Sequence, residues 1–294
     1  MIDGRSATMN LLPILYSLAS ALAWGAGDFS GGVASKRGDT YLVVLISQAL
    51  GGLLLAGLAL LYSESLLRNV DLVYGAVAGI AGMVGLLALY TGLASGRMSV
   101  IAPLAAIVSV TPPVVVAALT DGVPGAMTIV GFGFVLIAVW LLSAGGGATG
   151  RIQGSELRCA LIAGVAFSVY FVFIDRVSTG AIFVPLVAAR VASVSLLALY
   201  LRLRPGSLAR LQQGDRARGS LLAIIALAGL FDAAGNAFFA LAVQAGRLDV
   251  AVILASLYPA GTVFLAWIFL KEPVTRLQWL GVLSALIALA LIAI

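Results

Sequence analysis

Long apolar runs, separated by short polar segments, follow one another along almost the whole chain. A helix needs about 20 apolar residues, within a range of about 17 to 25, to cross a bilayer core about 30 Å thick. Ten runs meet this rule, at residues 11–34, 41–62, 72–94, 100–120, 126–143, 157–174, 182–201, 220–245, 250–270 and 277–294. The pattern therefore predicts an all-α integral membrane protein with ten transmembrane helices.

The composition agrees with this pattern and removes several function classes. Hydrophobic residues make up 62% of the 294 residues and charged residues 10%, and the mean hydropathy is +1.14, whereas a soluble domain has about 25% charged residues. The chain has no histidine and one cysteine, Cys159, which excludes metal sites and catalytic centres built on those residues. We expect no metal, no cofactor and no catalytic residue.

The net charge of +5 does not indicate a nucleic-acid partner. The basic residues lie in short segments between apolar runs, where membrane orientation is the ordinary cause of positive charge. No basic face or stacking platform for nucleic acid accompanies them. The partner that these charges indicate is the lipid bilayer.

The two halves of the chain align with each other at a constant separation of 150 positions, with low sequence identity. In this register glycines coincide: Gly79 with Gly229, Gly85 with Gly235, and Gly131 with Gly281. A constant register over such a length indicates an internal repeat, which we place at residues 1–148 and 149–294. Because five crossings are an odd number, the second repeat must enter the membrane from the opposite side, as in transporters with inverted repeats.

Several short motifs resemble the drug/metabolite transporter superfamily, and within it the ten-helix EamA-type carriers. The matching residues, in chain order, are Trp24-Gly25, Asp28-Phe29, Leu89-Tyr90, the run 96–103, Arg190, Tyr258-Pro259, Lys271-Glu272-Pro273 and Gly281. The chain departs from the family pattern at Asp121-Gly122, where the family usually has Gly-Glu. The resemblance implies export or exchange of a small-molecule substrate, such as an amino acid or a drug-like compound, by alternating access in a bacterial inner membrane.

Ionisable groups at bilayer depth are costly, roughly 2.5 to 3.5 kcal/mol each on insertion scales, so each needs a partner or a wet cavity. Asp28, Arg190 and Asp232 lie inside predicted spans. Asn236 follows Asp232 by four residues and therefore shares its helix face. We expect these four residues to bind substrate, with protons as a candidate coupling ion at either aspartate. The availability of both charge signs favours a zwitterion. The alternative is a structural ion pair between Arg190 and one aspartate.

Aromatic residues are candidates for the walls of the same cavity. Trp24 lies one turn before Asp28, and an indole beside a carboxylate can bind an organic ammonium by cation-π contact. Tyr90, Tyr170 and Tyr258 lie in the third, sixth and ninth spans, which line the central cavity in the resembled family. The alternative for each is ordinary packing between helices.

Interior prolines occur in the fourth and ninth spans, which correspond in the repeat. Pro103, Pro112 and Pro259 each remove a backbone hydrogen bond and permit a bend. We expect them to act as gating hinges, with static kinks as the alternative. In the third span a stripe of glycines permits close helix contact, within one chain or between two, which leaves monomer and homodimer open.

Two other functions are weighed against transport. Gly25-Ala26-Gly27-Asp28 fits the Gly-x-Gly-Asp motif of intramembrane aspartyl proteases, with Asp232 as a second carboxylate. The motif opens the protein here, whereas a Tyr-Asp precedes it in those proteases. A membrane scaffold or sensor is the other alternative, and the lack of a soluble signalling domain counts against it.

The orientation of the termini is left open by the sequence. Alternating assignment of the loops puts most lysines and arginines, among them Lys36, Arg37 and Arg202, on one side. The positive-inside rule then places both termini outside, whereas the resemblance implies cytoplasmic termini.

Overall fold

The computed structural model describes residues 11–65, 68–95, 98–144, 153–203, 218–270 and 275–293. These residues form helices and no strand. In chain order the helices are α1 (Leu12–Arg37), α2 (Thr40–Leu61), α3 (Asn69–Ser95), α4 (Met98–Thr120), α5 (Ala126–Ala144), α6 (Gly154–Asp175), α7 (Phe183–Leu203), α8 (Arg218–Ala245), α9 (Leu248–Ala255), α10 (Tyr258–Leu270) and α11 (Arg276–Ala293). Since α9 and α10 share the ninth predicted span, the ten predicted helices are all present.

The outer surface of the bundle is apolar. Among the described residues, α2, α3, α6, α7 and α8 contain spans long and apolar enough to cross a membrane, and shorter apolar spans lie in α4, α5, α9–α10 and α11. Large side chains such as Leu53, Leu119 and Trp279 are more than half exposed. Large apolar side chains exposed on many helices are expected where a protein contacts lipid, and with the apolar spans they indicate a multi-pass membrane protein.

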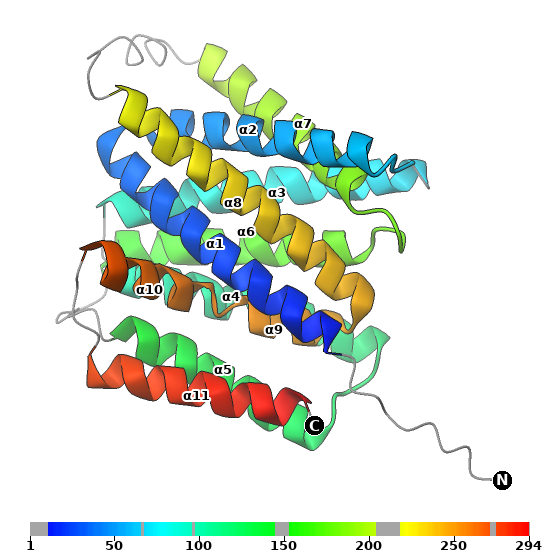
Figure 1. The fold of residues 1–294 in the computed structure, drawn as a ribbon, viewed down its shortest axis with the longest axis vertical. Helices are drawn as coiled ribbons and strands as arrows, with labels where there is room; N and C mark the ends of the chain where they lie inside the picture. The colour runs from blue at the N-terminus through cyan, green and yellow to red at the C-terminus, as the bar shows by residue number, and fades with distance from the viewer. Residues whose placement is uncertain are drawn as a thin grey trace.

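Helix α1 lies at the centre of the bundle and is rich in glycine, alanine and serine. It contacts α8 most extensively and also packs against α3, α9 and α10. Figure 1 shows α1 and α8 crossing the other helices side by side. Small side chains on α1 allow this close approach, because helix association in lipid depends on van der Waals packing.

The ends of the bundle are formed by two further helix pairs. Helix α5 packs against α11, and α2 packs against α7 and α8. In Figure 1 the α5–α11 pair lies at one end of the long axis, and α2 and α7 lie toward the other. The interior polar residues come from α1 and α8 and also from α2 and α7.

The ninth predicted span is broken, whereas the fourth is continuous. Helix α9 ends at Ala255, and α10 begins at Tyr258 after a turn at Ser256 and Leu257. Pro259 is the second residue of α10, a position where its missing N–H costs no helical hydrogen bond. Helix α4 runs unbroken through its prolines. The two spans that correspond in the predicted repeat therefore differ in backbone shape.

Side chains cap helices and tie distant segments together. The Asp39 carboxylate accepts hydrogen bonds from the backbone N–H groups of Tyr41 and Leu42 at the start of α2. The Glu64 carboxylate, after the end of α2, accepts three backbone hydrogen bonds of 2.8 to 2.9 Å from residues 182–184. These acceptors satisfy helix N-terminal N–H groups that have no intrahelical partner.

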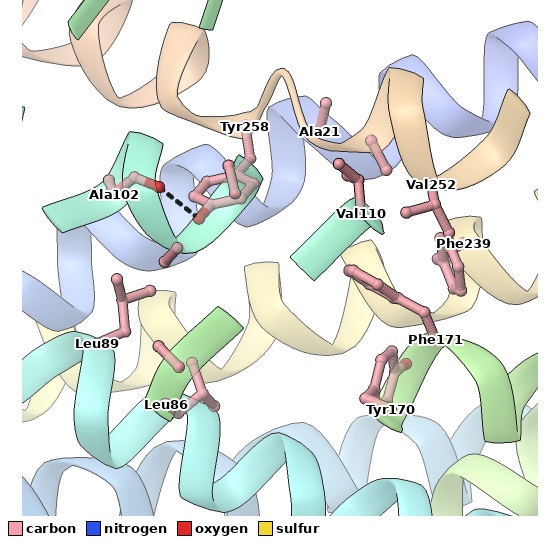
Figure 2. Packing of buried hydrophobic residues seen from close by; sticks show 14 of the residues in the cluster. Ala21, Leu86, Leu89, Ala102, Val110, Tyr170, Phe171, Phe239, Val252 and Tyr258 are labelled. Carbon is pink, nitrogen blue, oxygen red and sulfur yellow. Dashed lines mark hydrogen bonds between the residues drawn. The ribbon is translucent and has the colours of Figure 1, made fainter. Parts of the chain in front are cut away.

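Buried aromatic residues join α6, α8 and α10 to the helices around them. Figure 2 shows Phe171 of α6 beside Phe239 of α8, with ring centroids 4.8 Å apart. It also shows Tyr258 of α10, whose hydroxyl donates a 3.0 Å hydrogen bond to the carbonyl oxygen of Ala102 in α4. Phe171 and Tyr258 belong both to the buried hydrophobic cluster and to the lining of an interior cavity.

Candidate functional site: a central polar cavity

A cavity in the middle of the bundle is lined by residues from both halves of the chain. The first half contributes Trp24 and Asp28 of α1, Gln48 of α2, and Gly79, Gly82 and Leu86 of α3. The second half contributes Phe167, Tyr170 and Phe171 of α6, Leu186, Ala189 and Arg190 of α7, Asp232 and Asn236 of α8, and Tyr258 of α10. Its volume is about 50 Å³. One water needs roughly 10 to 15 Å³ on this measure, so the cavity has room for a few waters.

Arg190 and Asp232 form an ion pair between α7 and α8. The Arg190 Nη2 and Asp232 Oδ2 atoms are 2.7 Å apart, and the two side chains are 8% and 13% exposed. A pair this deeply buried is held together because either charge left alone would be desolvated without compensation. The sequence-based alternative of a structural ion pair between Arg190 and an aspartate is therefore present in the structure.

Gln48 completes the ion pair from α2. Arg190 Nη1 donates to Gln48 Oε1, and Gln48 Nε2 donates to Asp232 Oδ2 at 3.3 Å. Ser193, one turn after Arg190, also donates to Gln48 Oε1 at 3.1 Å. The amide thus bonds to both charged partners, and these contacts satisfy polar groups that lipid could not solvate.

Trp24 and Asn236 are joined across α1 and α8. The Trp24 indole N–H donates a 2.9 Å hydrogen bond to Asn236 Oδ1. The same indole contacts Tyr170, Phe171 and Phe239, with ring centroids 5.5 to 6.4 Å apart. The hydrogen bond and the ring contacts fix the orientation of the indole, so that Trp24 forms one rigid wall of the cavity.

Asp28 lines the cavity without a partner. Asp28 is 9% exposed, and no hydrogen bond or ion pair within the described part of the chain involves its carboxylate. It lies four residues after Trp24, so both side chains project from one face of α1. Asp28 therefore differs from Asp232, whose carboxylate is already bound by Arg190 and Gln48.

Two tyrosines of the cavity lining differ in the state of their hydroxyl groups. Tyr258 donates to the Ala102 carbonyl. The Tyr170 hydroxyl is buried and has no hydrogen-bond partner among the residues that the structure describes. A buried polar atom left unsatisfied costs roughly 1 to 3 kcal/mol, so the Tyr170 hydroxyl is a group that a bound ligand could satisfy.

Tyr90 lies beside α1 and is not part of the cavity lining. Its side chain is 1% exposed, and its hydroxyl donates to the Gly27 carbonyl at 3.4 Å. The ring fills the space next to Gly31, where a Cβ atom would come within 2.1 Å of it. The structure therefore gives Tyr90 a packing position behind Asp28.

The three prolines predicted as hinges also lie away from the cavity lining, as far as their side chains are described. Pro112 is exposed on α4, and Pro259 is buried near the start of α10. The backbone of Pro103 lies in α4, while its side chain is outside the described residues. The motif residues 96–97 and 271–273 are outside the described residues as well.

Gln48 and Gly82 line the cavity, although the sequence analysis did not consider Gln48 and assigned Gly82 only to the glycine stripe of the third span. Gln48 could have been found from the sequence, because it is a lone amide in the apolar run 41–62. The search for costly groups in the membrane considered only ionisable residues. Gly82 has only a packing signal. A Cβ atom there would meet Tyr170 Cδ2 at 3.4 Å, so this glycine leaves space on the cavity side of α3.

A second polar cluster lies outside the membrane-spanning segments, at the start of α9. Arg247 donates to both carboxylate oxygens of Asp249, at 3.1 and 2.8 Å, and to the carbonyls of Asp121 and Gly122. The hydrogen bonds to Asp249 raise the pKa of the Arg247 guanidinium, so it stays charged at any physiological pH. The cluster ties the α4–α5 connection to α9.

Comparison with known proteins identifies the relationship. Residues 155–294 match the EamA-like transporter family. The resemblance inferred from the sequence motifs is thereby confirmed in the second half of the chain. The second half of the chain is therefore similar to a family of membrane transporters, and the apolar helices agree with a membrane location. No curated protein matches the chain in sequence.

A solved structure, described only as the crystal structure of a protein, has the same fold as this chain. The two superpose with a TM-score of 0.72 at 16% sequence identity, over 95% of each chain. At this level of identity the likeness concerns the fold alone. This likeness in fold also includes the first half of the chain, which the family match does not cover.

Proposed function

We propose that the chain is a secondary transporter that exports or exchanges a small organic metabolite by alternating access, in a bacterial inner membrane. The observation that carries this proposal is the central polar cavity, whose lining comes from both halves of the chain. A buried ion pair and an unpartnered carboxylate are costly in a membrane protein and mark a functional site. Because the cavity has room for only a few waters, substrate entry requires the helices to move apart.

We also propose that residues 1–148 and 149–294 are inverted repeats. Helix contacts support this, since the extensive α1–α8 contact has its counterpart in α6–α3, and the α3–α7 contact has its counterpart in α8–α2. Such pairing of contacts is expected when a two-fold axis in the membrane plane relates the halves.

Repeat-related glycines support the same proposal. A Cβ atom at Gly79 would lie 2.1 Å from the Ala189 carbonyl of α7, and one at Gly229 would lie 2.2 Å from the Ser47 carbonyl of α2. The pair Gly85 and Gly235 likewise abuts aromatic rings on α6 and α1. Two halves of similar structure can exchange conformations, which supplies the inward-open and outward-open states of a carrier.

A cavity-filling variant tests the transport proposal. Metabolites inside and outside cells are measured by mass spectrometry for the wild type, Gly82→Leu, Gly57→Leu and an empty vector. Gly82 faces the cavity, whereas a Cβ atom at Gly57 meets nothing within 4 Å. We expect one group of metabolites to move with the wild type and Gly57→Leu but not with Gly82→Leu. Equal profiles for wild type and vector would instead favour the scaffold or sensor alternative.

Proton coupling is part of the proposal and is tested separately. Asp28 is the candidate proton site, with Arg190, Asp232, Tyr170 and Tyr258 as the other ionisable groups of the cavity lining. Tyr90, whose hydroxyl donates to the carbonyl of Gly27, is a further ionisable group close to Asp28. In proteoliposomes an imposed pH gradient should drive the substrate identified above. Flux that is the same with and without the gradient would remove protons as the coupling ion.

A further inference from the structure

The ion pair changes which charge the cavity offers to a substrate. Arg190 is bound by Asp232 and Gln48, so its guanidinium is engaged inside the protein. The described cavity lining holds two carboxylates and one guanidinium, which leaves a formal charge of −1 when all three are ionised. This excess charge resides on Asp28, the cavity carboxylate without a partner in the described part of the chain.

We propose that the substrate is an organic monocation, an amine with a flat apolar body and no carboxylate. This inference rests on the proposed transport function and deepens it. It replaces the zwitterion hypothesis drawn from the sequence. A substrate carboxylate would have to displace Asp232 from Arg190, and the displaced aspartate would then be a buried charge without compensation.

The neutral part of the cavity suits the same ligand. Trp24, Tyr170 and Phe171 place aromatic rings in the lining, and Trp24 is held by Asn236 and by its ring contacts. Aromatic faces attract an ammonium through their quadrupole, and they also pack against a flat apolar body. The Trp24–Asp28 spacing of one helical turn puts the indole and the carboxylate on one side of the ligand.

The unpartnered Tyr170 hydroxyl provides a second polar contact. It is buried, lines the cavity and accepts or donates no hydrogen bond within the part of the chain that the structure describes. Its oxygen can accept one ammonium N–H while Asp28 accepts another, because a primary ammonium has three donors. Two unsatisfied acceptors in an aromatic cavity would thus be satisfied by one ligand.

Three probes with one phenyl body and different charges test the inference: phenethylamine, phenylalanine and phenylpropionate. Equilibrium binding is measured by calorimetry on the full chain in lipid nanodiscs. We expect phenethylamine to bind at least about tenfold tighter than the other two, which corresponds to a hydrogen bond to a charged group. Tighter or equal binding of phenylalanine or phenylpropionate, or no binding of any probe, would overturn the inference.

Variants separate the role of Asp28 from a general effect on folding. Asp28→Asn should weaken phenethylamine binding at least about tenfold, and Tyr170→Phe should weaken it severalfold. Asp121→Asn, which removes an exposed carboxylate outside the cavity, should leave binding unchanged. If Asp28→Asn elutes as aggregate, the binding test uses Tyr170→Phe and Asp28→Glu instead. Asp28→Glu keeps the charge. Unchanged binding of phenethylamine in Asp28→Asn would refute the site. If Asp28→Asn aggregates, unchanged binding in Tyr170→Phe would refute it instead.

Flux of the same probes into proteoliposomes distinguishes this inference from the proposed function. Selective binding of phenethylamine without flux of any probe would uphold the site chemistry and count against transport. Flux of phenylalanine without phenethylamine would uphold transport and overturn the monocation inference. Flux of phenethylamine that is lost in Asp28→Asn would support both.

Discussion

Arg190 of α7 and Asp232 of α8 are joined by an ion pair of 2.7 Å, and Gln48 of α2 bonds to both. Three helices from the two halves of the chain therefore meet at one polar contact inside the membrane. The contact engages the guanidinium of the cavity inside the protein, and the proposal that Asp28 sets the charge met by a ligand rests on this contact.

The ion pair should matter for stability mainly through what is left when one partner is removed. Asp232→Ala leaves a buried guanidinium and should lower the free energy of unfolding by about 3 to 5 kcal/mol. Arg190→Met combined with Asp232→Leu removes both charges and should recover most of that loss. Unfolding in detergent micelles measures both variants. A double variant as unstable as the single one would show that the pair itself, and not the orphaned charge, sets the stability.

Close helix contacts at Gly79 and Gly229, which correspond in the proposed repeat, should be intolerant of even one methyl group. Gly79→Ala and Gly229→Ala place a Cβ atom about 2 Å from a backbone carbonyl, so α3 and α8 must move away from α7 and α2. We expect each to lower the free energy of unfolding by about 1 to 3 kcal/mol. Gly133→Ala, where a Cβ atom meets nothing within 4 Å, is the matched control. Equal stability of all three variants would contradict the predicted contacts.

The Glu64 carboxylate should stabilise the start of α7. It accepts hydrogen bonds from three backbone N–H groups, at residues 182–184. Glu64→Ala should cost about 1.5 to 3 kcal/mol, the range for hydrogen bonds to a charged group. Thermal unfolding compares this variant with Asp121→Ala, which removes an exposed carboxylate whose side chain caps no helix. If both variants melt together with the wild type, the cap contributes nothing measurable.

Arg247 should be only partly replaceable by lysine. Its guanidinium binds both oxygens of the Asp249 carboxylate, whose side chain is fully buried, and two backbone carbonyls besides. Arg247→Ala should lower the free energy of unfolding by about 1 to 3 kcal/mol, because Asp249 loses its ion-pair partner. Arg247→Lys keeps the charge but not the bidentate geometry. Its free energy of unfolding should lie between those of the wild type and Arg247→Ala. Full stability of the lysine variant would mean that charge alone is sufficient.

The orientation in the membrane is tested by labelling single cysteines. In a Cys159→Ser background, Val123→Cys lies in the α4–α5 connection and Gly38→Cys in the α1–α2 connection. The charge distribution predicts that an impermeant thiol reagent added to whole cells labels position 123 and not position 38. The reverse pattern would place both termini in the cytoplasm, as the family resemblance implies.

Part of the candidate site could be predicted from the sequence because charged residues are rare in apolar runs. Asp28, Arg190 and Asp232 are conspicuous for that reason, and the structure places all three in the cavity lining. Asn236 could be added from its helical spacing after Asp232. Gln48 is equally isolated in its apolar run but was not predicted. An amide carries no charge, and the criterion was the cost of burying an ionisable group.

Other assignments depended on which way a helix faces its neighbours. Tyr90 and Tyr258 look alike in the sequence, yet Tyr258 lines the cavity while Tyr90 fills the space beside Gly31. The prolines of the fourth and ninth spans also look alike, yet only the ninth span is broken. A local pattern indicates that a proline permits a bend, but packing decides whether the bend is made.

The sequence by itself determined the membrane-spanning helices and the family resemblance. Bilayer thickness sets the length of each apolar run, and this constraint acts on every span separately. Only the tertiary structure decided that Arg190 is bound by Asp232 and Gln48, while Asp28 and the Tyr170 hydroxyl have no partner within the described ranges. Those pairings join residues far apart in the chain, and they depend on the order and rotation of packed helices, which no local pattern of residues contains.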